Sequence, residues 1–97
     1  MALLCAVVAL NFPPYTFKVK NKENKRLIFD PIRKLFVTLT PEEWVRQHVL
    51  RFLLEEKNYP ASLIAVERQL KIHTRTKRTD IVVYNTQGTP EVLIECK

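Results

Sequence analysis

Two patterns of apolar residues divide this chain into regions. Over residues 40–58 apolar side chains recur every three to four positions, as they do along one side of a helix. Over residues 62–97 apolar and polar positions largely alternate, which predicts a meander of three antiparallel strands. Residues 1–38 contain shorter apolar runs around a polar stretch at 21–25, and they predict an arm or a small hairpin. We therefore expect an α+β fold in a single domain over residues 1–97.

The predicted helix carries boundary signals at both ends. Thr40 suits the N-cap and Pro41 the first helical position, and Glu43 stands where a capping box needs its acidic residue. Asn58 and Pro60 predict the end of the helix. Its apolar stripe is wide, so we expect the helix to be covered on more than one side.

The connection at residues 85–90 contains Gly88 and predicts a hairpin between the last two strands. If the turn is centred just before Gly88, residues that face each other have numbers that sum to 175. Asp80 then faces Glu95, and Lys97 lies on the same side of the sheet as both. The opposite side is expected to pack against the core, and it carries Ile81, Val83, Val92, Ile94 and Cys96.

This register predicts a site with two carboxylates. Asp80 and Glu95 would stand about 5 Å apart on neighbouring strands and would repel each other unless a cation lay between them. Oxygen ligands of this kind suit Mg²⁺. Lys97 would point at the same place, where it could neutralise charge on a phosphate or help to activate a metal-bound water. The same residues could instead be ordinary solvated charges at the end of a strand.

The charge balance favours an anionic partner. The chain has 16 Lys and Arg against 10 Asp and Glu, a net charge of +6, and nucleic acid is the first partner that such a charge suggests. A basic cluster just before Asp80 could contact backbone phosphates or could form a solvated loop. It consists of Lys71, Arg75, Lys77 and Arg78.

Aromatic residues interleave with lysines near the start of the chain. Tyr15 and Phe17 are followed by Lys18 and Lys20 in an alternating pattern. This pattern is typical of a half-buried strand, and it also suits a surface on which bases stack.

Composition excludes several other classes of protein. A single glycine in 97 residues rules out a glycine-rich phosphate loop. Cys5 and Cys96 match neither a metal-binding spacing nor a disulfide framework, which favours a reducing cytoplasm. The apolar stretch 1–10 is too short to span a bilayer and lacks the features of a signal peptide, so we expect a buried strand or a loose terminus and no membrane partner.

Five segments together resemble a known family of nucleases. They are residues 28–34 (IFDPIRK), 39–47 (LTPEEWVRQ), 63–67 (LIAVE), 78–84 (RTDIVVY) and 93–97 (LIECK). In these segments the chain resembles the PD-(D/E)XK nuclease superfamily. More closely, it resembles the N-terminal nuclease domain of type I restriction enzyme R subunits and small stand-alone proteins related to that domain.

The resemblance implies a restriction-endonuclease-like core and a DNA endonuclease, a hydrolase of phosphodiester bonds that depends on Mg²⁺ or Mn²⁺. It implies that Asp80 and Glu95 are metal ligands, that Cys96 adds its backbone carbonyl, and that Lys97 is the catalytic lysine. It also implies that Glu43 approaches the metal from the helix, although the capping box alone would account for this residue.

Three further residues remain open between two roles. Arg46 and Gln47 could face the substrate, but a solvated side of the helix is favoured for both. Glu67 could approach the site or be a surface residue of its strand.

The sequence departs from the superfamily pattern in two places. Thr79 stands where the superfamily motif has proline, and the chain ends at Lys97. We therefore expect the second core helix and the fourth strand to be missing. The alternative function is a non-catalytic nucleic-acid-binding or assembly module that keeps the nuclease fold. It would self-associate through the strand at 91–97 or receive its missing part from additional subunits.

Overall fold

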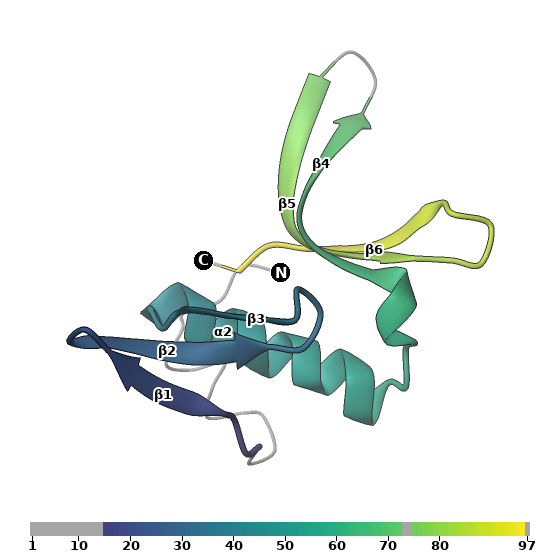
Figure 1. The fold of residues 1–97 in the computed structure, drawn as a ribbon. Coiled ribbons are helices and arrows are strands. Elements are labelled where there is room, and N and C mark those ends of the chain that lie inside the picture. Colours follow the sequence, from purple (N-terminus) through teal and green to yellow (C-terminus); the bar gives the residue numbers. More distant parts are fainter. Residues whose placement is uncertain (1–14, 73–74, 97) are drawn as a thin grey trace.

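The structure is a computed structural model that describes residues 15–72 and 75–96. These residues form one α-helix and two antiparallel sheets of three strands each, so the predicted α+β class is confirmed (Figure 1). The predictions for the apolar stretch 1–10 lie outside the described residues. Within the described part of the chain, no helix is long and apolar enough to cross a membrane.

The first sheet is more complete than the predicted arm or hairpin. It contains β1 (Val19–Lys22), β2 (Lys25–Asp30) and β3 (Leu35–Thr38) in sequence order. Between β1 and β2, Glu23 and Asn24 have φ angles of 51° and 66°, as a tight two-residue hairpin turn requires.

The turn between β2 and β3 depends on a side chain. The Asp30 Oδ1 atom accepts hydrogen bonds from the backbone N–H groups of Ile32 and Arg33, both at 2.8 Å. The backbone N–H of Lys34 donates to the Asp30 carbonyl oxygen at 2.7 Å. An aspartate that caps its own turn in this way reverses the chain without a glycine.

Helix α2 spans Pro41–Arg51 and continues as the π-helical segment η1, Phe52–Glu56. The Thr40 hydroxyl accepts the Glu43 backbone N–H at 3.0 Å, so the predicted N-cap is confirmed. The helical segment ends close to the predicted boundary, before Asn58.

The second sheet contains the predicted meander. A short 3₁₀ helix, Ala61–Leu63, leads into β4 (Ile64–Ile72), which is followed by β5 (Arg75–Tyr84) and β6 (Pro90–Ile94). The strands pair in the order β4-β5-β6, so β6 lies at one edge of the sheet. Strand β5 includes the basic stretch before Asp80, which forms the far end of a long hairpin with β4 (Figure 1).

The predicted register between β5 and β6 is confirmed. Ile81 pairs with Ile94 and Val83 with Val92, and the register shifts by one residue at Tyr84. In the connecting turn Gly88 has a φ of 82°, a left-handed conformation that favours glycine.

Helix α2 lies between the two sheets and packs against both. Toward the first sheet, Gln47 contacts Asp30, and Ile28 of β2 is fully buried. Toward the second sheet, the side of β5 and β6 that was predicted to face the core is buried. The helical and sheet members of this core are Val45, Val49, Leu50, Leu53, Ile64, Ile81, Val83, Ile94 and Cys96.

Candidate active site

The end of β6 and the middle of β5 meet at Asp80. The backbone N–H of Cys96 donates a hydrogen bond of 2.7 Å to Asp80 Oδ2. Because Ile81 pairs with Ile94, the next facing positions along the two strands are Asp80 and Glu95. The structure therefore places the backbone segment 95–96 beside Asp80, and the predicted catalytic Lys97 lies outside the described residues.

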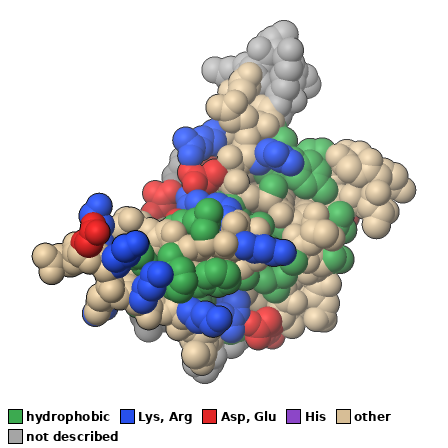
Figure 2. Space-filling model, in the orientation of Figure 1, with side chains coloured by type: hydrophobic (Ala, Val, Ile, Leu, Met, Phe, Trp, Pro, Cys, Tyr) green, Lys and Arg blue, Asp and Glu red, His purple; other side chains and the backbone are tan. Residues whose placement is uncertain are grey.

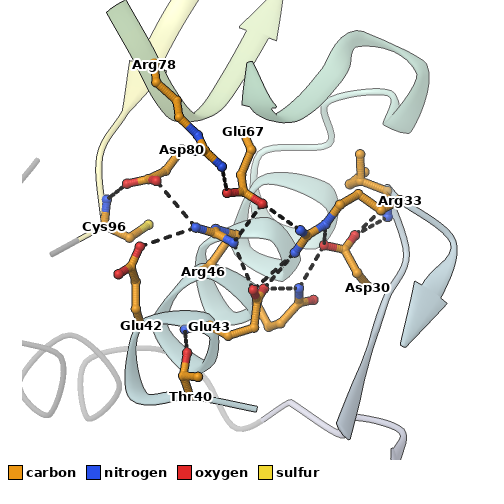
Figure 3. A network of polar contacts seen from close by, with 12 residues as sticks. Asp30, Arg33, Thr40, Glu42, Glu43, Arg46, Glu67, Arg78, Asp80 and Cys96 are labelled. Carbon is orange, nitrogen blue, oxygen red and sulfur yellow. Dashed lines mark hydrogen bonds and ion pairs between the residues drawn. The ribbon is translucent and has the colours of Figure 1, made fainter. Parts of the chain in front are cut away.

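A guanidinium group reaches Asp80 from the helix. Arg46 Nη2 lies 3.4 Å from Asp80 Oδ1 and 3.4 Å from an oxygen of Glu42, and Arg46 Nη1 lies 2.8 Å from Glu43 Oε1 (Figure 3). Only 5% of Arg46 is exposed, and Gln47 is fully buried. The solvated helix side that the sequence favoured for these two residues is therefore wrong. It is wrong because α2 is covered by a sheet on each side.

The Glu43 side chain turns inward and does not return to the helix N-terminus. Its two oxygens accept hydrogen bonds from Arg33 Nη2 at 3.1 and 3.0 Å, from Arg46 Nη1 at 2.8 Å and from Gln47 Nε2 at 2.9 Å. These donors occupy both oxygens of a buried carboxylate. The donor set around Glu43 therefore fits a structural anchor better than a metal ligand.

Asp30 and Arg33 belong to the same network, although sequence reasoning assigned them no role. Asp30 is fully buried and accepts hydrogen bonds from Arg33 Nε at 2.7 Å and from Gln47 Nε2 at 3.0 Å. Burial by itself would lower the pKa of the Arg33 guanidinium, but its contacts with Asp30 and Glu43 outweigh burial and raise the pKa. The available signal was the segment DPIR, which places an acidic and a basic residue three positions apart around a proline.

Glu67 joins the network from β4. It stands opposite Asp80, between the pairs Val66–Ile81 and Arg68–Thr79, and its φ of 54° is in the left-handed region. Its carboxylate accepts a hydrogen bond from Arg33 Nη1 at 2.9 Å and forms an ion pair with Arg78. Of the two roles that the sequence left open for Glu67, the structure therefore favours the one near the site.

The basic cluster before Asp80 is described only in part. Arg78 is exposed and pairs with Glu67. The side chains of Lys71, Arg75 and Lys77 lie outside the described part of the structure.

The network as a whole is negatively charged. It joins five carboxylates to three guanidinium groups, which gives a formal charge of −2. The carboxylates are those of Asp30, Glu42, Glu43, Glu67 and Asp80, and the guanidinium groups are those of Arg33, Arg46 and Arg78 (Figure 3).

The chemistry of the donors decides which cation fits beside Asp80. No cluster of three or more His, Cys, Asp or Glu side chains with metal-site geometry occurs among the described residues. The carboxylates of Asp80 and Glu95 are nevertheless hard oxygen donors of the type that Mg²⁺ prefers. Among the described residues, Asp80 Oδ1 contacts Arg46 Nη2 at 3.4 Å, which is long for a hydrogen bond. The donor atoms of Asp80 and Glu95 are thus of the type that a hard divalent cation binds, whereas both oxygens of Glu43 already accept hydrogen bonds.

Cys96 contributes its backbone to the site, and its thiol is chemically inert. The residue is 4% exposed, and burial raises the pKa of its thiol to about 11, with a further contribution from the Asp80 carboxylate. A thiol with this pKa stays protonated at neutral pH. It is therefore neither a nucleophile nor a thiolate ligand for a soft metal.

A comparison with protein families now identifies the region that contains this site. A family model described as the N terminus of the type I restriction enzyme R protein matches residues 41–97, more than half of the chain. The chain belongs to this family. Searches among curated proteins and among solved structures found no significant match.

Membership in the type I R-protein N-terminal family relates the chain to restriction enzymes, as the sequence resemblance predicted. The matched region begins at the first residue of α2 and includes the whole β4-β5-β6 sheet. Asp80 and Glu95 lie inside it. Asp30, Arg33 and the β1-β2-β3 sheet lie before it, so two of the eight charged residues of the network lie outside the match.

Proposed function

We propose that this member of the R-protein N-terminal family is a Mg²⁺-dependent DNA endonuclease-like domain. The observation that carries the proposal is the hydrogen bond from the Cys96 backbone N–H to Asp80, because it holds a carboxylate of β5 against the segment that contains Glu95. Mn²⁺ would substitute for Mg²⁺ at an all-oxygen site. The substrate would be DNA in the cytoplasm, and further subunits would complete the assembly.

Each residue of the site has a separate role in this proposal. Asp80 and Glu95 would hold the ion, together with the backbone carbonyl of Cys96. A bound Mg²⁺ activates water and stabilises negative charge at a phosphoryl group. Lys97 would supply a further positive charge to the phosphate under attack.

The residues around Asp80 orient its carboxylate. The Cys96 N–H occupies Oδ2, while Arg46 approaches Oδ1. Arg46 is too deeply buried to reach a duplex directly, so its role is to position Asp80 and to balance its charge.

A plasmid-nicking assay tests the proposal. With Mg²⁺ present, the chain should convert supercoiled plasmid to open circles, and Asp80→Asn should lower the rate by at least a hundredfold, because it removes a charged metal ligand. Glu91→Gln is a matched control, since Glu91 is an exposed acidic residue of the same sheet. Full activity in the Asp80→Asn variant would exclude Asp80 as a metal ligand.

The exposed edge of the second sheet supports a second candidate function. Strand β6 pairs only with β5 among the described residues, and Leu93 on this strand is 44% exposed. Edge strands with exposed apolar side chains pair with other strands. In this alternative the chain is an assembly module that associates through β6, and its buried arginine–carboxylate network serves stability alone.

A further inference from the structure

The positive charge of the chain is concentrated before the region that the family model matches. Residues 1–40 contain seven Lys and Arg against two Asp and Glu, a net charge of +5. Residues 41–97 contain nine against eight, a net charge of only +1. The electrostatic attraction for an anion therefore comes mainly from the β1-β2-β3 sheet and not from the candidate active site.

Strand pairing places most of these lysines on one face of the sheet. Ile28 and Asp30 of β2 are fully buried, and Asp30 contacts Gln47 of α2, so their face points toward the helix. The alternate positions form the opposite, outer face, because successive side chains of a strand point to opposite sides. The outer face consists of Lys18, Lys20, Lys22, Lys25, Leu27, Phe29, Phe36 and Thr38.

Lysines and aromatic rings are in direct contact on the outer face. Phe29 and Phe36 pair across β2 and β3, with ring centroids 5.3 Å apart. Lys18 Nζ lies 5.6 Å from the centroid of the Phe29 ring, and Lys20 Nζ lies 4.1 Å from that of Phe36. Figure 2 shows Lys and Arg side chains around a band of hydrophobic side chains over this sheet.

This combination suits a single strand of nucleic acid. Lysines two positions apart on β1 are separated by about 6.6 Å, twice the rise of a strand, which is close to the spacing of successive phosphates in an extended strand. Contacts between an exposed ammonium and a ring are weak. Each lysine can therefore leave its ring for a phosphate, and the ring face that it uncovers can stack on a base.

Tyr15 and Phe17, which the sequence offered for base stacking, contact residues of the helix instead. The Phe17 ring packs against Trp44 and His48, with centroids 5.3 and 4.8 Å apart. Tyr15 contacts His48 and Phe17, and Arg51 lies over both the Tyr15 and the Phe17 rings. The Tyr15 and Phe17 rings thus contact residues of the helix, whereas Phe29 and Phe36 contact each other on the outer face of the sheet.

We propose that the outer face of the β1-β2-β3 sheet binds single-stranded DNA, with phosphates on Lys18, Lys20 and Lys22 and bases on Phe29 and Phe36. The choice of DNA rests on the proposed function, but the binding surface does not use the site at Asp80. The sheet would hold a strand beside the family domain and would contribute most of the affinity.

Fluorescence anisotropy of the full chain with a labelled single-stranded DNA of about 20 nucleotides tests the proposal. The buffer contains EDTA, so no metal-dependent step contributes. Three phosphate contacts predict that log K falls with log salt concentration with a slope of about −2. Replacing Lys18, Lys20 and Lys22 together by Gln should weaken binding at least tenfold and bring this slope close to zero.

The aromatic contribution is tested separately. Phe36→Leu keeps an apolar side chain in the sheet and removes the ring, so it should weaken binding about tenfold and leave the salt slope unchanged. For the lysine variant the matched control is Lys57→Gln, because Lys57 is exposed at the end of η1, outside the sheet, and should contribute nothing to binding. Circular dichroism melting curves verify that each variant is folded.

Two results would overturn the proposal. One is wild-type affinity and salt slope in the triple lysine variant. The other is an unchanged affinity in Phe36→Leu together with tighter binding of duplex DNA, because backbone contacts alone would then explain the interaction. Asp80→Asn distinguishes this proposal from the nuclease proposal: it should leave binding in EDTA unchanged, whatever its effect on plasmid nicking.

Discussion

Replacing Arg46 by Met tests whether the buried network stabilises the fold. Arg46 is 5% exposed and ties α2 to β5 through Asp80, while its shortest contact, 2.8 Å, is with Glu43. Methionine has a similar length and keeps most of the packing of the side-chain stem. The substitution therefore removes a charge and its hydrogen bonds and leaves only a small cavity.

The expected loss in the free energy of unfolding depends on the contacts that Glu43 keeps in the Arg46→Met variant. Removing one partner of a buried ion pair costs about 3–5 kcal/mol, because the other charge is left uncompensated. Glu43 keeps its contacts with Arg33 and Gln47, so we expect the lower limit, about 3 kcal/mol. For a domain of this size such a loss lowers the melting temperature by on the order of 15 °C.

Urea unfolding followed by circular dichroism measures this free energy directly. Arg68→Met is the control, because Arg68 is exposed on β4 with a hydrogen bond to the Tyr84 hydroxyl, and its loss should cost less than about 1 kcal/mol. Adding Glu43→Gln to the Arg46→Met variant should restore part of the stability. A loss below about 1 kcal/mol for Arg46→Met, or no recovery in the double variant, would refute the assigned role of the network.

Two further predictions concern the thiol and the sheet edge. Because burial raises the pKa of Cys96 from 9.0 to about 11, the unfolded chain loses this proton first as the pH rises. The stability that this pKa shift contributes is fully present below pH 9 and is lost between pH 9 and 11, with a slope of up to about 1.4 kcal/mol per pH unit. In urea unfolding measured as a function of pH, Cys96→Ala should remove this contribution to the slope. Leu93→Lys places a charge on the exposed edge strand, so it should shift a self-associating sample toward monomer in sedimentation velocity, and an unchanged mass distribution would argue against association through β6.

The parts of the fold that follow from neighbouring residues were predictable. The Thr40 cap depends on a side chain and a backbone N–H three positions apart, and the β5–β6 register depends on the turn that contains Gly88. Once that register is known, alternation decides which residues of the two strands face the core. The meeting of Asp80 with the segment at 95–96 follows from the same local pattern.

Contacts between distant segments could be decided only by the tertiary structure. The third strand of the first sheet depends on the Asp30 side chain, which caps a turn where the apolar pattern is interrupted. The aromatic surface consists of Phe29 and Phe36, because the Phe17 ring packs against Trp44 of the helix.

Arg46 illustrates the physical reason. Its position on the helix predicts a solvated side chain, since polar residues near a helix N-terminus usually face water. Here the helix packs against both sheets, and the cost of burying the guanidinium is offset by carboxylates of its own helix and by Asp80, which is 34 positions away along the chain. Local sequence specifies which charges are present, and only the packing of the helix between two sheets decides which of them are buried and paired.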